Sequence, residues 1–191
     1  MKCELQTGLV TTPSGPIVEL MSYPASWTVR RARDAYLAEN GFTVESYDDK
    51  WTDASFLGLK LSVPNTRKHR WAIMRHDLHH VATGFGTDMV GEGEISAWEL
   101  RGARALGVYV ASIVFSGAML GFFCAPRRAL EAFRAGRGTN HLFRDFEVNE
   151  EAEYEALLDL TVGELRDRMG LPQEGIATHP AKLHDYAPSS L

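Results

Sequence analysis

The expected fold is decided by residues 75–92, RHDLHHVATGFGTDMVGE. A helical pattern stops at Gly84, which suits a left-handed helix end, and Asp88 is suited to cap a second helix by accepting a hydrogen bond from a backbone N–H. Two helices joined by so short a break are typical of an antiparallel hairpin. We therefore predict helices at about 67–83 and 89–106, joined by a tight turn at 84–87.

The first of these helices gathers polar side chains on one arc. His76, Asp77 and His80 lie at relative angles of about 0°, 100° and 40° for 3.6 residues per turn. His79 lies at about −60°, at the edge of that arc or facing away. Imidazoles at positions i and i+4 are about 5 to 6 Å apart at Cβ, which suits two ligands of one metal ion.

The turn brings Glu92 into register with this arc. His80 lies four residues before Gly84, and Glu92 lies four residues after Asp88, so an antiparallel hairpin places both side chains at the same height. Two imidazoles and two carboxylates suit Zn²⁺ and, if one position stays open, Fe²⁺ or Mn²⁺. The alternative is that the histidines are hydrogen-bonded helix residues and the aspartate a solvated charge. We predict a metal site, catalytic as well as metal-binding, of His76, Asp77, His80 and Glu92.

Outward from this segment, the sequence predicts a mostly α protein forming a single domain over 1–191. Residues 1–65 form a mixed segment punctuated by prolines, with short strands expected at 17–21 and 57–63 and a helix at 27–40. Residues 66–172 form a helical metal-binding core, and 173–191 form a tail. Further helices are expected up to about 124, at 126–135, at about 150–158 and after Thr161, where Thr161 and Glu164 form a capping box.

The helix that ends near 124 carries no charge between Arg104 and Arg127, a run of 22 residues. We expect a buried core helix whose Gly117-x-x-x-Gly121 edge lets a neighbour approach closely. Two alternatives stay open. The helix could line an apolar tunnel for a lipid tail, or its length would allow it to cross a bilayer.

Composition excludes several function classes. The net charge is −5 and no dense basic stripe occurs, so we expect no nucleic-acid partner. The two cysteines, Cys3 and Cys124, form neither a thiolate zinc motif nor a disulfide framework.

Since no signal or transit peptide is visible, we expect a cytoplasmic protein that starts near Met1. Walker, dinucleotide-binding and serine-hydrolase motifs are absent from the sequence.

Two known histidine motifs fit the segment less well. The zinc-peptidase motif His-Glu-x-x-His uses glutamate as its general base, whereas Asp77 is one methylene shorter and reaches less far towards a metal-bound water. The His-Asp phosphohydrolases need a further upstream histidine and a later aspartate, and His69 and Asp88 match those positions poorly.

The spacing His76-Asp77-x-x-His80-x₁₁-Glu92 resembles the zinc-binding signature of the coenzyme Q biosynthesis protein four family, which acts in ubiquinone biosynthesis. The surrounding Gly-x-Gly-Thr-Asp and Gly-Glu elements are similar as well. The similarity continues through the apolar helix, 133–137 and 162–166, so it covers roughly residues 66–172, about half of the chain.

This resemblance implies a helical fold and a divalent metal held by the four predicted ligands. It also implies a hydrophobic tunnel for a polyprenyl tail and peripheral association with a membrane. The implied activity is that of a lyase-like oxidative decarboxylase, which replaces the ring C1 carboxylate of a polyprenyl-4-hydroxybenzoate-type precursor by hydroxyl.

Three hypotheses follow. The first is a metal-dependent enzyme acting on a prenylated aromatic acid. The second is a lipid-binding scaffold of a quinone-biosynthesis complex with a structural metal. The third is a relative acting on a non-quinone specialised metabolite. In each case we expect a hydrophobic small-molecule partner and a cytoplasmic location at or near the inner membrane face, with a homodimer among the expected assemblies.

Overall fold

The computed structural model describes residues 23–56, 59–143 and 151–178, and these are mostly helical, which confirms the predicted fold class. The described helices are α1 (Val29–Glu39), α2 (Arg67–Thr83), α3 (Met89–Glu99), α4 (Gly107–Cys124), α5 (Pro126–Ala135), α6 (Glu151–Leu158) and α7 (Val162–Met169). Two short 3₁₀ helices, η1 (Val44–Asp48) and η2 (Ala103–Leu106), and an antiparallel pair of strands, β1 (Trp51–Phe56) and β2 (Leu59–Pro64), complete the described elements.

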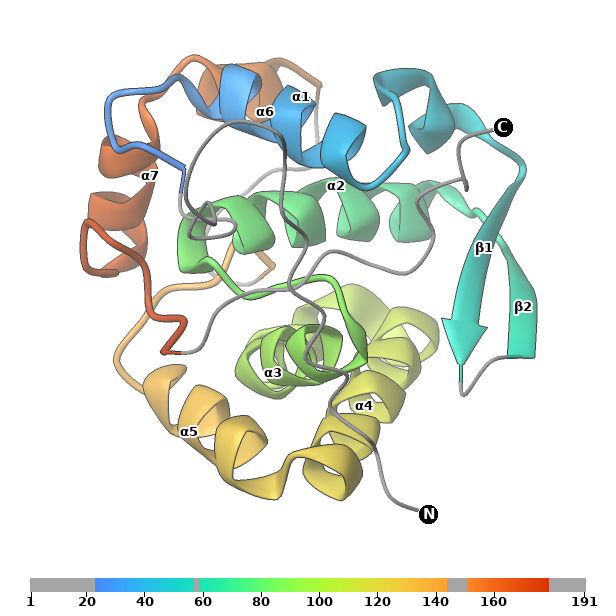
Figure 1. The fold of residues 1–191 in the computed structure, drawn as a ribbon. Coiled ribbons are helices and arrows are strands. Elements are labelled where there is room, and N and C mark those ends of the chain that lie inside the picture. The colour runs from blue at the N-terminus through green and yellow to red at the C-terminus, as the bar shows by residue number, and fades with distance from the viewer. Residues whose placement is uncertain (1–22, 57–58, 144–150, 179–191) are drawn as a thin grey trace, which may run out of the picture.

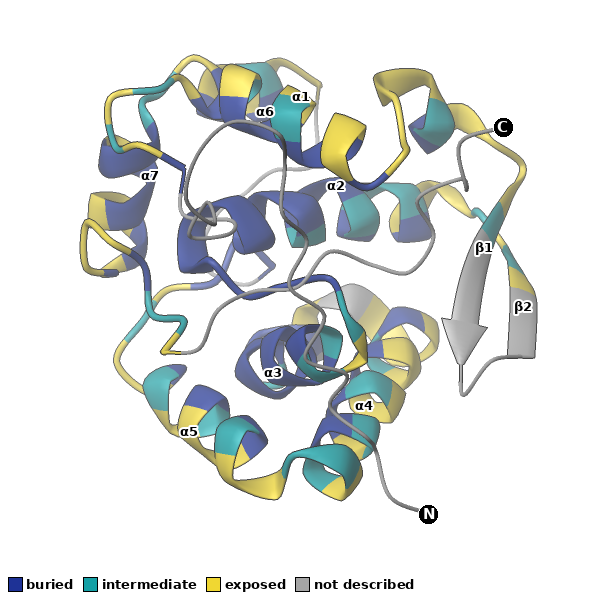
Figure 2. Cartoon of the chain, viewed as in Figure 1, coloured by how far each residue is buried: buried dark blue, intermediate teal, exposed yellow. Residues whose placement is uncertain are grey.

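Helix α2 crosses the middle of the molecule (Figure 1). It has α1 and α6 on one side and α3, α4 and α5 on the other, with α7 beside its C-terminal end and the β1–β2 pair beyond its N-terminal end. Every residue from Asp77 to Thr83 is buried, so the C-terminal half of α2 contacts protein on all sides (Figure 2). A helix enclosed in this way can hold polar side chains in fixed orientations away from bulk water.

The C-terminal end of α2 is held by a buried arginine from α7. The Arg166 guanidinium donates to the carbonyls of Ala82, at 2.9 Å, and Val81, at 3.4 Å. The backbone N–H groups of Ile176 and Ala177 both donate to the Thr83 carbonyl, so part of the predicted tail packs here. These contacts satisfy carbonyls that a helix end leaves without intrahelical partners.

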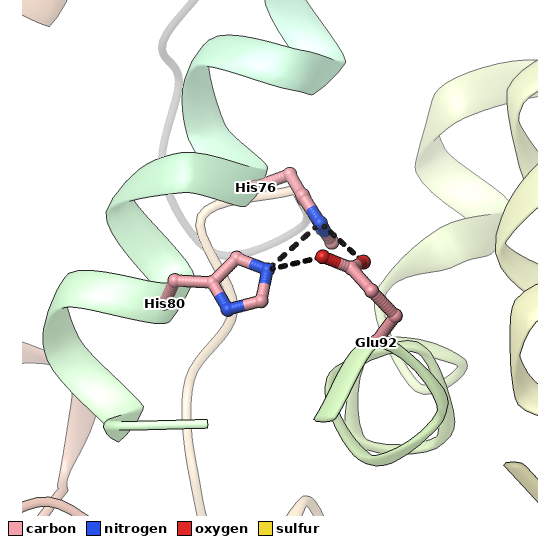
Figure 3. A group of neighbouring side chains, drawn as sticks. All are labelled: His76, His80 and Glu92. Atoms are coloured by element: carbon pink, nitrogen blue, oxygen red, sulfur yellow. Dashed lines mark hydrogen bonds and ion pairs between the residues drawn. The ribbon is translucent and has the colours of Figure 1, made fainter. Parts of the chain in front are cut away.

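The turn between α2 and α3 forms as predicted at both of its ends. Gly84 closes α2 in the left-handed conformation, with φ of 82°, and the Asp88 side chain accepts from the Gly91 N–H at 2.7 Å. The prediction that the two helices are antiparallel is wrong, because α2 lies lengthwise across the picture while α3 is seen nearly end-on (Figures 1 and 3). The two helices therefore cross steeply, and α3 packs mainly against α4 and α5.

Helix α3 is also shorter than predicted. It ends at Glu99, and residues 103–106 form η2 instead of continuing the helix. A Cβ at Gly102 would lie 3.0 Å from Cβ of His141, so the chain passes close to a neighbouring segment at this point. This close approach coincides with the break between α3 and η2.

The prediction that the apolar helix is buried is wrong, because α4 lies at the surface. Only 22% of its most apolar window is buried, and the buried positions form one stripe, Val110, Val114, Ala118 and Gly121. Large apolar side chains are exposed along it, namely Val108, Tyr109, Ile113, Phe115, Met119 and Phe123. By length and composition, α4 is the one helix among the described residues that could cross a bilayer.

The glycine edge of α4 does bring a neighbour close, as predicted. A Cβ on Gly121 would lie 2.7 Å from the Gly93 Cα of α3, and a Cβ on Gly93 would lie 2.4 Å from the Gly121 Cα. A Cβ on Gly117 would meet the Ser96 Oγ at 2.4 Å. Small residues on both helices let the two backbones meet, which sets the direction of α3 and the position of Glu92.

The other sequence predictions for local structure have mixed outcomes. The predicted helix at 27–40 corresponds to α1, and the strand at 57–63 overlaps β2, although residues 57–58 lie outside the described residues. The strand at 17–21 also lies outside them. The Thr161 and Glu164 capping box is present, and Gly170 ends α7 with a φ of 68°.

Candidate metal centre

Three of the four predicted ligands meet beside the α2–α3 turn (Figure 3). The His76 Nε2 atom lies 3.4 Å from Oε2 of Glu92, and the His80 Nε2 atom lies 3.4 Å from Oε1 of the same carboxylate. The two Nε2 atoms are 3.1 Å apart. The predicted approach of Glu92 to the two histidines is therefore confirmed, although the helices that carry them are not antiparallel.

These distances suit a tetrahedral metal ion. Zinc bonds to imidazole nitrogen and carboxylate oxygen are about 2.0–2.2 Å long, so two ligand atoms of a tetrahedral site lie about 3.3 Å apart. The three separations in this group are 3.1, 3.4 and 3.4 Å. His76, His80 and Glu92 can thus hold one metal ion together.

The outer nitrogen of each histidine is already engaged. Nδ1 of His80 lies 2.9 Å from the carbonyl oxygen of Phe85, and because a carbonyl only accepts, Nδ1 carries the hydrogen. Nδ1 of His76 lies 2.8 Å from Oε1 of Glu99. When both rings are neutral, as metal binding requires, the lone pair is on Nε2, the atom that faces the partner ligands.

Asp77, the fourth predicted ligand, is not one of these three. Its buried carboxylate accepts a hydrogen bond from the Tyr47 hydroxyl at 2.5 Å, and the Tyr36 hydroxyl interacts with it as well. Burial raises the pKa of Asp77. An angle of about 100° from His76 turns this side chain towards η1 and α1 instead of α3.

His79 faces away from the group, which is one of the two orientations predicted for it. Its Nε2 accepts the Leu142 backbone N–H at 3.0 Å, and its Nδ1 lies 2.6 Å from Oε1 of Glu99. Trp98 and Phe143 pack edge-on against the ring. Burial lowers the pKa of His79, so the ring is neutral in this position.

Glu99 was missed by the sequence analysis, although a signal for it existed. It lies seven residues after Glu92, which is two helical turns, so both carboxylates share one face of α3. Glu99 is fully buried and accepts from both His76 and His79. Glu99, on the same face of α3 as Glu92, thus holds the ring of the ligand His76.

The charges of the centre reinforce one another. Burial acts to raise the pKa of Glu92, but the two imidazoles outweigh it and hold that pKa well below its ordinary value. Burial likewise acts to raise the pKa of Glu99, which His76 and His79 lower to about 2. Burial acts to lower the pKa of His76, yet Glu99 and Glu92 raise it well above 6.5. Both acids are therefore ionised at neutral pH.

One side of the centre is open. The His80 side chain is fully buried and stacks on the Tyr36 ring, with ring centroids 5.3 Å apart. The side chains of His76 and Glu92 are 25% and 36% exposed. A molecule in solution can therefore reach the group from the side of these two residues.

The chain matches no protein-family model, no curated protein and no solved structure. The resemblance in the ligand spacing therefore stays a prediction.

Proposed function

We propose that the protein is a metal-dependent enzyme in which His76, His80 and Glu92 hold a divalent cation. The observation that carries this proposal is the spacing of the three ligand atoms, combined with the exposure of two of the ligands. Structural zinc sites have four protein ligands, whereas catalytic sites have three and keep a position for water or substrate. The donor set favours Zn²⁺, with Fe²⁺ or Mn²⁺ as the other candidates.

The proposed substrate is a hydrophobic aromatic acid. A bound divalent ion acts as a Lewis acid on carboxylate or phenolate oxygen and stabilises charge that develops there. By the resemblance of the ligand spacing, the reaction is oxidative decarboxylation of a polyprenyl-4-hydroxybenzoate-type precursor. The ring loses CO₂ and gains a hydroxyl oxygen, a two-electron oxidation that requires a separate oxidant such as dioxygen. A non-quinone aromatic acid is the alternative substrate.

The surface of α4 supports a hydrophobic partner. Its exposed apolar side chains extend along the helix, and monomeric soluble proteins rarely expose large contiguous apolar patches. We propose that this face contacts a membrane surface from the cytoplasm, which would bring the protein close to a lipid-soluble substrate. A lipid-binding scaffold with a structural metal would use the same face, and a homodimer would cover it.

The metal content of the protein tests the enzyme against the scaffold. Purified protein should contain one equivalent of zinc, iron or manganese, and cobalt substituted for it should bind an added aromatic carboxylate with a change in its visible spectrum. Turnover of a prenylated 4-hydroxybenzoate under air then identifies the reaction. A protein that takes up no stoichiometric metal contradicts the proposal. A cobalt spectrum that does not change with any added carboxylate favours the scaffold.

The lipids that copurify with the protein separate the substrate classes. Mass spectrometry of extracted protein should detect a prenylated aromatic compound if the quinone-pathway proposal is right. Recovery of a short, unprenylated aromatic acid would move the proposal to the non-quinone alternative.

A further inference from the structure

We infer that Glu99 is the positioning residue of the metal ligand His76, and that His79 serves to hold Glu99. This inference rests on the proposed metal site. The three side chains form a buried chain in which Oε1 of Glu99 lies 2.8 Å from Nδ1 of His76 and 2.6 Å from Nδ1 of His79. Glu99 and His79 are both fully buried.

A backbone N–H fixes which nitrogen of His79 carries the hydrogen. The Leu142 N–H can only donate, so Nε2 of His79 carries no hydrogen and its Nδ1 carries one. That Nδ1–H donates to Oε1 of Glu99, and the same oxygen lies within hydrogen-bond distance of Nδ1 of His76, which donates to it. His76 is thereby held with Nε2 directed at the metal position.

These hydrogen bonds also explain why the three neighbouring histidines, His76, His79 and His80, have different roles. His76 and His80 each use Nδ1 as a donor and present Nε2 to Glu92. His79 has both ring nitrogens engaged, one by a backbone N–H and one by Glu99, so it is not available as a ligand. It ties the ligand helix α2 to the segment that contains Leu142.

The buried charge of Glu99 supports a link to the metal. Among the described residues, Oε2 of Glu99 has no hydrogen-bond partner, so this carboxylate is not fully satisfied by neutral donors. A buried carboxylate is costly unless charge nearby compensates it. The carboxylate–histidine–metal arrangement provides that charge.

The test compares two buried acids of the same helix in the full-length protein. Glu99→Gln removes the charge and keeps the shape, and Glu94→Gln does the same at a carboxylate paired with Arg128. We expect Glu99→Gln to weaken zinc binding about 10- to 100-fold, and Glu94→Gln to change it less than about twofold. Zinc dissociation constants come from competition with a chromophoric chelator, and the visible spectrum of bound cobalt reports the ligand geometry.

The outcomes separate this inference from the proposed function. If the wild-type protein binds no zinc, the metal site itself is wrong and the inference falls with it. If the wild-type protein binds zinc and Glu99→Gln binds it equally tightly with the same cobalt spectrum, the positioning role of Glu99 is wrong while the metal site stands. Equal losses in both variants would indicate general destabilisation and would also overturn the role.

A measurement on the unmutated protein covers the case in which Glu99→Gln does not fold. Long-range ¹⁵N–¹H NMR spectra of the zinc-loaded protein distinguish the two neutral histidine tautomers. We expect His76 and His79 each to carry the hydrogen on Nδ1. A His76 ring protonated at Nε2, or a His79 ring that carries two hydrogens, would overturn the inference.

Discussion

The Nε2 atoms of His76 and His80 face each other across 3.1 Å, while the Nδ1 atom of each ring is engaged by another acceptor. Two lone pairs at this distance repel each other unless a proton or a cation lies between them. Glu92 approaches both nitrogens from the next helix. This relationship is the physical basis of the metal assignment.

Replacing one imidazole should remove the metal and leave the fold. His80→Ala should lose stoichiometric metal and all activity, because two ligands do not hold the ion, while the helical circular-dichroism signal stays within about a tenth of the wild-type value. His69→Ala is the matched control, since His69 is a buried histidine of the same helix without a place in the group. An His80→Ala protein that keeps a full equivalent of metal would refute the site.

Metal binding should release a proton at neutral pH. Glu99 and Glu92 raise the pKa of His76 above 6.5, so the metal-free protein holds a proton that the cation must displace. The apparent metal affinity should therefore rise with pH until pH exceeds the raised pKa. Calorimetry in buffers of different ionisation enthalpy measures the number of protons released. A value near zero at pH 7 would contradict this prediction.

The same raised pKa makes the stability of the metal-free protein depend on pH. A folded-state pKa above the unfolded value stabilises the fold below pH 6.5, and the contribution is lost as pH rises through the folded-state pKa. In urea unfolding of chelator-treated protein, the free energy of unfolding should therefore lose this contribution as the pH rises above 6.5. In His76→Gln, the decrease should be smaller.

The glycine contact between α3 and α4 should be sensitive to one methyl group. Gly93→Ala places a Cβ within 2.4 Å of the Gly121 backbone, so we expect a loss of about 1–3 kcal/mol in the free energy of unfolding. Because Glu92 is the adjacent residue, metal affinity should fall as well. Gly138→Ala is the control, because nothing lies within 4 Å of its Cβ position. Equal stability of the two variants would show that the helices are not in backbone contact.

The exposed face of α4 should mediate membrane contact. Flotation with phosphatidylcholine and phosphatidylglycerol vesicles should recover the wild-type protein, and Phe115→Glu together with Phe123→Glu should reduce recovery at least about fivefold without lowering metal content. Phe42→Glu is the control, because Phe42 is exposed outside α4. Vesicle binding unchanged by the double substitution would contradict the role, and loss of a dimer in the same variant would assign the face to a second copy.

The sequence predicts the turn and the ligand register because both depend on local features. Gly84 and Asp88 fix the two helix ends, and the ligands one turn from the bend on each helix stay near each other although the helices cross steeply. The steep crossing itself depends on Gly93 meeting Gly121, a contact between distant positions that a local pattern does not reveal. Glu99 could have been found by extending the face of Glu92 by two turns.

Two other features depend on tertiary context. Asp77 is drawn from the ligand arc by the Tyr47 hydroxyl, which lies 30 residues earlier in the chain. The composition of α4 fits a core helix and a surface helix equally well, since apolarity alone does not say what covers a helix. In the fold, α3 and α5 contact α4 and leave most of its large apolar side chains exposed.

Anomalous diffraction from zinc-loaded crystals, recorded above and below the zinc absorption edge, locates the bound metal relative to its three proposed ligands. We expect one anomalous peak at about 2.0–2.2 Å from Nε2 of His76, Nε2 of His80 and a carboxylate oxygen of Glu92. A zinc peak elsewhere, or none at this position in fully loaded protein, would contradict it.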